Sequence, residues 1–268
     1  MKILLEQNDV NPNANDKYGR TPFSWAAWNG HERVVRALLE RSDVNLDTFD
    51  KYGQTPFLRA AWHGHEGVVR ILLERSDVNP ATGDEDGLTP LSRAAWYGRE
   101  GVVRILLERN DVNPSTPSNS GRTPLSLAAR NGHDGVVRIL LERNDVNPDT
   151  TDEDGRTPLS WAARYGHEGV VRILLERNEV NPNTPSNSGR TPLSLAAGNG
   201  HDGIVRILLE RNDVNPDTAN KHGRTPIFFA AEKGHEGVVG ILLERNDVNP
   251  NTPDRYGQTP LSSSAEWK

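Results

Sequence analysis

The stretch Gly121-Arg122-Thr123-Pro124-Leu125-Ser126-Leu127-Ala128-Ala129 decides the fold, because versions of it return at a fixed interval along the chain. The interval is 34 residues, measured between successive Thr-Pro pairs. A period of this size is typical of stacked supersecondary units, each of which buries its apolar face against its neighbours. The Thr-Pro pairs begin at Thr21, Thr55, Thr89, Thr123, Thr157, Thr191, Thr225 and Thr259.

Each Thr-Pro pair predicts the start of a short helix. A Thr side chain can accept a hydrogen bond from a backbone N–H of the first turn, and Pro suits the first helical position because it has no N–H to satisfy. Leu125, Ala128 and Ala129 then fall at helical spacing and form a narrow stripe that a neighbouring helix can approach closely. The helix is expected to end at Asn131-Gly132-His133, where Gly can adopt the left-handed conformation.

A second helix is predicted over residues 134–143, which read Asp-Gly-Val-Val-Arg-Ile-Leu-Leu-Glu-Arg. Two apolar stripes run along it side by side, so its apolar face is wide and must be covered on two sides. One stripe is Val136, Ile139 and Leu140, and the other is Val137 and Leu141. The unit is therefore a pair of helices that packs against a pair before it and a pair after it.

A Thr-Pro-Leu-x-x-Ala-Ala helix, a Gly-His turn, a Val-Val-x-x-Leu-Leu helix and an Asp-Val-Asn tail together resemble the ankyrin repeat. The resemblance covers essentially the whole chain. It implies an all-α solenoid of stacked helix-turn-helix units joined by β-hairpin-like loops. It also implies a non-catalytic role in binding a protein partner, since the family typically uses its hairpin tips and the concave face of its first helices.

The chain departs from the family pattern in places. Ser126 and most of its equivalents stand where the family has His, and Arg-Asn-Asp or Arg-Ser-Asp follows the second helix in place of Gly. The Ser variant followed by Trp161 is similar to ankyrin arrays of large fungal proteins. Units 118–151 and 186–219 are nearly identical, which indicates either duplication of a repeat pair or design from a consensus.

The repeat boundaries make residues 1–268 a single array, expected to be elongated because solenoids grow by adding units. Ile3, Leu4 and Leu5 lack a first helix, and Leu261 begins a helix with no second helix behind it. We expect such apolar ends to fray or to associate, so the chain is predicted to be a monomer, with end-to-end association as the alternative. Partial repeats occupy 1–15 and 254–268, and full repeats occupy 16–49, 50–83, 84–117, 118–151, 152–185, 186–219 and 220–253.

Composition narrows the functional classes. The net charge of −6 argues against nucleic acid as a partner, which would require a concentrated basic face. The chain has no Cys, hence no disulfide, no Cys zinc site and no thiol nucleophile. Neither a signal-like nor a membrane-length apolar run is present, so we expect no membrane partner and a cytoplasmic location, with the nucleus as the alternative. Charged pairs at helical spacing, Glu66 with Arg70 and Glu100 with Arg104, are interpreted as solvated surface pairs.

Repeated polar residues are interpreted as structural, and no cofactor or metal is expected. One His recurs in the turn of most repeats, but stacked helices lie about 8–10 Å apart, too far to share a zinc ion with bonds of about 2 Å. His63 and His65 make a two-ligand pair at best. The acidic hairpins 84–87 and 152–155 lack the spaced ligands of a calcium loop. The recurring Ser hydroxyls lack a nucleophile elbow and a matched His and acid.

The informative variation lies on the side of the first helix opposite its Ala stripe. Trp28, Trp62 and Trp96 occupy the same place in three consecutive units, so the stack should bring them into a ladder. Trp, Tyr and Arg are the residues that most often dominate binding energy. The predicted partner-binding residues are Trp28, Trp62, Trp96, Arg59, Arg93, Tyr97, Tyr18 and Tyr52.

Two alternatives remain open at the level of sequence. Each Trp either faces the solvent or packs mainly against the adjacent repeat. The chain either binds a protein partner or serves as a structural spacer or engineered scaffold with no selected ligand. An enzymatic role is not expected, because a residue that recurs once in each repeat is architectural first.

Overall fold

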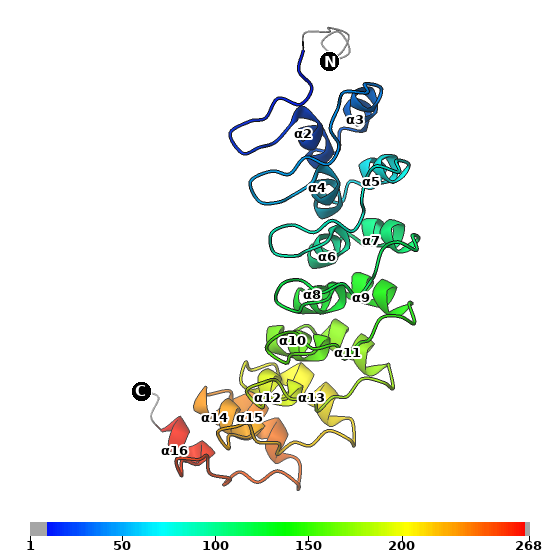
Figure 1. Cartoon of the computed structure of the whole chain (residues 1–268). Helices are drawn as coiled ribbons and strands as arrows, with labels where there is room; N and C mark the ends of the chain where they lie inside the picture. Colours follow the sequence, from blue (N-terminus) through cyan, green and yellow to red (C-terminus); the bar gives the residue numbers. More distant parts are fainter. Residues whose placement is uncertain (1–9, 266–268) are drawn as a thin grey trace. The chain divides into compact units, whose positions relative to one another are not determined.

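The computed structural model describes residues 10–265, which contain fifteen helices and no strand (Figure 1). The helices alternate between a first and a second member of each repeat. The first helices are α2 (Pro22–Trp28), α4 (Pro56–His63), α6 (Pro90–Trp96), α8 (Pro124–Arg130), α10 (Pro158–Tyr165), α12 (Pro192–Ala197), α14 (Pro226–Glu232) and α16 (Pro260–Ser264). The second helices are α3 (Glu32–Leu39), α5 (Glu66–Leu73), α7 (Glu100–Leu107), α9 (Asp134–Leu141), α11 (Glu168–Leu175), α13 (Asp202–Leu209) and α15 (Glu236–Leu243).

The chain forms two compact units, and each is a run of stacked repeats. Unit 1 comprises the residues up to 124 together with 139–146, and unit 2 comprises 125–138 together with the residues from 147 onward. In unit 1 the first helices α2, α4 and α6 stack in order, and α3, α5 and α7 stack beside them. In unit 2 the corresponding rows are α10, α12, α14 and α16, and α11, α13 and α15. The predicted all-α, paired-helix architecture is confirmed in both units.

The predicted caps explain where the first helices begin and end. The Thr55 side chain accepts a hydrogen bond from the backbone N–H of Leu58 at 3.1 Å, and Pro56 follows at the first helical position. Gly64 ends this helix with a φ of 82°, the left-handed conformation that the sequence predicts. The same Thr cap occurs at Thr21, Thr89, Thr157, Thr191, Thr225 and Thr259.

The Ser that replaces the family's His is also part of the helix start. Ser24 is buried, and its hydroxyl donates to the carbonyl oxygen of Thr21 at 2.9 Å. Ser194 makes the same bond to Thr191 at 2.9 Å. A hydroxyl committed to its own first turn is unsuited to nucleophilic attack, so these contacts support the architectural interpretation of the recurring Ser.

The core follows the two stripes read from the sequence. Ala60, Ala61, Val68 and Val69 are fully buried, and repeats 84–117, 118–151, 152–185 and 186–219 bury an equivalent set. The small Ala side chains let successive first helices approach closely, whereas Val, Ile and Leu of the second helices fill the space on two sides. The same helix positions are therefore buried in successive repeats. Trp28 and Trp62 lie on a different face of the first helices.

Turn residues join successive repeats within each unit. The His65 ring Nε2 lies 2.6 Å from the carbonyl oxygen of Trp28, in the last turn of α2. Where Arg99 replaces His, its Nε donates to the carbonyl oxygen of Trp62 at 3.1 Å. These carbonyls lack a partner inside their own short helix, so the next repeat satisfies them. The sequence correctly placed His65 at a helix start but did not reveal this bond.

The Arg that replaces the family's Gly after the second helix has a comparable role. Arg143 Nη1 donates to the carbonyl oxygen of Leu107 at the end of the preceding second helix, at 3.2 Å. The same guanidinium binds Asp145, with Nη2 2.8 Å from Oδ2. This hydrogen bond, rather than burial, lowers the pKa of Asp145. The Arg-Asn-Asp segment thus caps a neighbouring helix, which the family pattern achieves differently.

One prediction for the second-helix surface is wrong. Glu66 does not pair with Arg70 within its helix; Arg70 instead approaches Glu108 of the next repeat, at 3.8 Å. The Glu66 carboxylate lies over Gly101 of the next repeat, where an added Cβ would come within 1.8 Å of it. The acid is drawn to the neighbouring helix because Gly leaves room for it there. Likewise Arg104 pairs with Glu142 at 3.6 Å rather than with Glu100.

The two chain ends differ in what the structure describes. Ile3, Leu4 and Leu5 lie outside the described residues. At the other end, Leu261 of α16 and Leu243 of α15 are exposed and border a cavity of about 590 Å³ in unit 2. End-to-end association through such surfaces stays a prediction. Among residues 10–265, no helix combines the length and apolarity needed to cross a bilayer.

Candidate functional site

Six aromatic rings form a continuous stack across the first helices of unit 1, which we call the aromatic ladder. It consists of Trp25, Trp28, His63, Trp62, Tyr97 and Trp96, in the order of contact. Successive ring centroids are 5.2, 5.3, 5.3, 5.3 and 6.2 Å apart, and each pair of ring planes lies within 27° of parallel. Offset stacking at these separations is favourable beyond the burial of area.

The three predicted Trp rungs belong to this ladder, but they do not touch one another directly. His63 lies between Trp28 and Trp62, and Tyr97 lies between Trp62 and Trp96. Trp28, Trp62 and Trp96 are all half-buried. The alternatives left open by the sequence, solvent-facing or packed against the next repeat, are therefore both partly realised: each ring stacks on a neighbour and keeps one part accessible.

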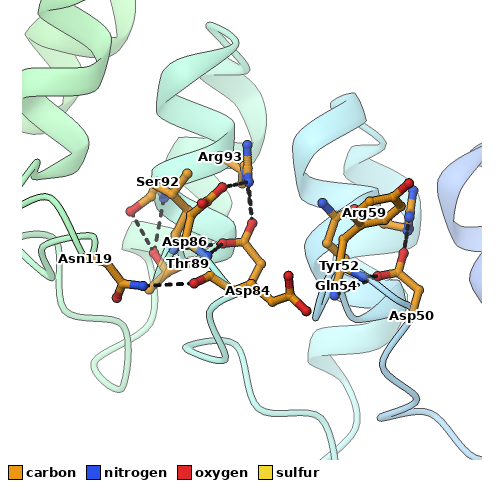
Figure 2. A network of polar contacts seen from close by, with 12 residues as sticks. Asp50, Tyr52, Gln54, Arg59, Asp84, Asp86, Thr89, Ser92, Arg93 and Asn119 are labelled. Carbon is orange, nitrogen blue, oxygen red and sulfur yellow. Dashed lines mark hydrogen bonds and ion pairs between the residues drawn. The ribbon is translucent and has the colours of Figure 1, made fainter.

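Arg59 and Arg93 lie beneath the ladder instead of on its surface. Their side chains are almost fully buried, with exposed fractions of 2% and 8% for the whole residues. The Arg59 guanidinium binds the buried carboxylate of Asp50, and Arg93 binds Asp84 Oδ2 at 2.6 Å and Asp86 Oδ2 at 3.1 Å (Figure 2). Because they are buried, these two arginines lie where they can support the rings, and their predicted part in partner binding stays a prediction.

The buried arginines support the Trp rings by cation–π contact. The Arg59 guanidinium carbon lies 4.1 Å from the centroid of the Trp28 ring, and that of Arg93 lies 5.1 Å from the Trp62 ring. Arg20 approaches Trp25 to 4.3 Å and is itself bound to Asp16 at 3.0 Å. Because each cation is held by a carboxylate, its orientation under the rings is fixed.

The acid that holds each of the two buried arginines, Arg59 and Arg93, lies nine residues before it, at the first position of the hairpin. Asp50 pairs with Arg59 and Asp84 with Arg93, while Asp152 accepts a bond from Trp161 Nε1 at 2.9 Å. Hairpins that begin with Ser carry Leu at the later position, as in Ser118 with Leu127 and Ser186 with Leu195. This paired variation is visible in the sequence and could have shown that Arg59 and Arg93 face inward.

Beside the ladder lies a pocket of about 450 Å³, entirely within unit 1. Tyr52 is 55% exposed at its rim, and Tyr18 is half-buried. The buried Oε1 of Gln54 has no hydrogen-bond partner, so the wall offers one unused acceptor. The pocket is lined by Tyr18, Arg20, Trp28, Tyr52, Gln54, Arg59 and Trp62. Tyr97, 37% exposed, completes the accessible aromatic surface farther along.

Three members of the site were missed by the sequence-based prediction. Trp25 is 39% exposed and starts the ladder. Arg20 lies over Trp25 and Trp28. His63 joins two rungs, and its buried Nε2 has no partner. Burial lowers the pKa of His63 below its ordinary value of 6.5, and the charges of His65, Arg59 and Arg99 lower it further.

The polar clusters offer little for metal chemistry. Among residues 10–265, no group of three His, Asp or Glu side chains is placed to hold a metal ion. Asp84 and Asp86, in an acidic hairpin, are occupied by Arg93. What the geometry offers is an aromatic surface with a shallow pocket, which is suited to contact with another molecule's side chains.

Fold and site together define a helical repeat protein whose first helices carry the aromatic ladder on one face. The chain belongs to the ankyrin repeat family: models described as "Ankyrin repeats (3 copies)" match residues 1–82, 46–117, 77–149 and 144–218, and one described as "Ankyrin repeats (many copies)" matches 208–262. Ankyrin repeats are generally modules of protein–protein interaction. A search of curated proteins found no match to this chain.

Proposed function

We propose that this chain is a non-catalytic scaffold that binds a protein partner through the aromatic ladder and the hairpin tips of unit 1. The observation that carries the proposal is the ladder itself, a stack of rings that crosses three repeats and remains partly accessible throughout. A large aromatic side chain buries about 150–250 Å² on contact at little entropic cost. Trp and Tyr, which make up most of the ladder, are among the residues that most often dominate the binding energy of protein interfaces.

The arrangement favours binding over a purely structural role for these rings. A core aromatic would be buried with the Ala stripe, whereas Tyr52 is 55% exposed and Tyr97 is 37% exposed. The buried Asp50–Arg59 and Asp84–Arg93 ion pairs lie beneath the Trp28 and Trp62 rings and hold these rings in place before any partner arrives. Such preorganisation reduces the entropy lost on association. A structural spacer with no selected ligand is the alternative, and it has no need of an accessible stack.

The proposal is tested with a photo-cross-linking amino acid placed singly at Tyr52, Tyr97 and Arg70. Tyr52 and Tyr97 belong to the proposed surface, and Arg70 is an exposed residue of α5 that serves as the control. In an extract of the source cells, positions 52 and 97 should cross-link the same protein, and position 70 should not. Cross-links absent from all three positions, or equal among them, would favour the spacer.

A second arm separates contact from stability. Tyr52→Ala should leave the unfolding midpoint nearly unchanged, because this side chain is 55% exposed, whereas Tyr97→Ala should lower the midpoint slightly, because its ring stacks on Trp62 and Trp96. Both variants should weaken capture of the purified cross-linked protein by about tenfold each, as expected for interface hot spots. Trp62→Ala should lower both affinity and stability, since this ring is half-buried between His63 and Tyr97. Unchanged capture by both Tyr variants would contradict the proposed surface.

A further inference from the structure

Unit 2 contains an arginine that lacks the acidic partner its equivalents have. Arg156 is paired with Asp154 at 2.6 Å, and Arg224 with Asp254 at 3.1 Å. At the same register Arg190 has no carboxylate within ion-pair distance among the described residues, because its hairpin carries Ser186 and Ser188 in place of acids. Its guanidinium therefore forms no direct ion pair among the described residues.

The position of Arg190 is nevertheless well defined. Its Nη2 donates to the carbonyl oxygen of Ser194 at 3.0 Å, and its guanidinium carbon lies 4.1 Å from the centroid of the Phe229 ring. A Cβ on Gly198 would come within 2.7 Å of Nη2, so the guanidinium fills the space that this glycine leaves open. The buried Nε has no hydrogen-bond partner, which leaves donor capacity unused.

A second cation, Arg164, acts on Arg190 electrostatically. Arg164 of α10 is half-buried, packs over the rings of Trp161 and Tyr165, and has no ion pair among the described residues. Burial first and the charge of Arg164 second together lower the pKa of Arg190 to about 10. The opposing charge that acts on Arg190 is Glu232, which already holds Arg224 at 3.0 Å. Two poorly hydrated cations that repel each other favour the arrival of an anion.

We propose that Arg190 and Arg164 form a docking point for an acidic segment of a protein partner, in which Asp or Glu carboxylates bind the two guanidinium groups. The inference rests on the proposed function, since it names the chemistry of a protein partner, but it concerns a second surface, in unit 2. Arginine suits this role because its planar fork matches a carboxylate. The exposed ring of Tyr165 provides an apolar neighbour for the segment.

A nucleic acid fits this surface less well than an acidic peptide. The chain carries a net charge of −6, which repels a polyanion at long range, and only two unpaired guanidinium groups carry the argument here. A nucleic-acid interface normally neutralises many phosphates along a basic stripe. A short acidic segment needs only a local pair of cations.

The test uses the full chain and the acetylated, amidated peptide tetraglutamate, with tetraglutamine as the uncharged control. Binding is followed by NMR of the arginine Nε–Hε signals. Tetraglutamate should shift the signals of Arg190 and Arg164, and its affinity should fall as salt is raised. Arg190→Gln should weaken binding about tenfold, as expected for loss of a charge-assisted hydrogen bond. Gln is tolerated at this register, since Gln54 and Gln258 occupy it in other repeats.

Arg138→Gln is the matched control, because Arg138 lies on the second-helix face of unit 2 and is paired with Glu176 at 3.6 Å. It should leave tetraglutamate binding unchanged. The inference is overturned if Arg190→Gln binds tetraglutamate as tightly as the unaltered chain, if tetraglutamine shifts the same signals, or if oligouridylate binds there more tightly. Each of these outcomes leaves the cross-linking result at Tyr52 and Tyr97 unaffected, so failure here is distinct from failure of the proposed function.

Discussion

Repeat 50–83 of unit 1 and repeat 186–219 of unit 2 share a backbone and differ on one face. Both begin with a Thr cap, end their first helix near a left-handed Gly, and bury the same Val, Ile and Leu positions. In the first, Asp50 and Arg59 form a buried ion pair beneath Trp28 and Trp62. In the second, Ser186 and Leu195 fill the same places without charge. The scaffold thus tolerates two solutions for one interior position while keeping the Thr cap and the buried positions of the second helix.

The difference teaches that residues on the first-helix face vary in linked sets. A buried cation requires its acid, so Arg59 cannot change independently of Asp50. A change at one position of a hairpin therefore alters the support of a ring in the neighbouring repeat. The buried Asp–Arg pairs thus determine how the aromatic rings on the surface are held. Changing these pairs leaves the fold intact, because the Thr caps and the apolar core lie at other positions.

The largest expected effect breaks this link directly. Asp50→Ser removes the acid and leaves the Arg59 cation buried, which should cost about 3–5 kcal/mol of stability. The double variant Asp50→Ser/Arg59→Leu copies the unit 2 solution and should recover most of that loss. Chemical denaturation followed by circular dichroism, fitted with a nearest-neighbour model suited to repeat arrays, measures both. Equal losses for the single and double variants would show that no linkage exists.

The reverse exchange is the matched control in unit 2. Leu195→Arg alone places an unpaired cation in a buried site, whereas Ser186→Asp/Leu195→Arg supplies its acid. We expect the single variant to be destabilised and the double variant to be partly rescued. Failure of the rescue would mean that the two faces differ in backbone position as well as in side chains.

A smaller effect should be the same in both repeats. Thr55→Ala and Thr191→Ala each remove a side-chain acceptor from a first-turn N–H, bonded at 3.1 and 3.2 Å respectively. Each substitution should cost about 1 kcal/mol, the usual value for an N-cap. The same denaturation measurement applies. A clear difference between the stability losses of the two variants would contradict the view that the helix caps are independent of the residues on the ladder face.

The smallest expected effect is a pH dependence confined to the ladder. The folded-state pKa of His63 lies below its ordinary value of 6.5, so the unfolded chain binds this proton more readily. The stability that neutral His63 contributes is therefore fully present above about pH 6.5 and is lost as the pH falls toward the folded-state pKa. Between pH 7 and pH 5 the melting temperature should drop by about 2–4 °C more than in His63→Tyr, which copies Tyr97.

His63→Tyr isolates this contribution because the other histidines remain in the variant. Differential scanning calorimetry at pH 5, 6 and 7 provides the comparison. An identical pH profile for the unaltered chain and the variant would show that His63 titrates normally between its two Trp neighbours. A steeper loss in the variant would reverse the sign of the argument.

The sequence by itself determined the repeat, the helix starts and ends, and the buried stripes. Each depends on residues a few positions apart: Thr55 caps the helix that Pro56 begins, and Ala60 and Ala61 face one side because of the helical period. The aromatic ladder could be predicted in part, since Trp28, Trp62 and Trp96 share one register. Local periodicity is enough to place such residues on a face.

Only the tertiary structure decided which residues on that face are accessible. Arg59 and Arg93 turn inward to their acids, Trp25 turns outward, and His63 bridges two repeats. The physical reason is that exposure depends on neighbours about one repeat away, whose side chains fill or leave the space beside each position. Charge pairing and ring stacking between repeats decide which side chains are buried and which stay exposed. Helical periodicity within one repeat carries no information about these contacts.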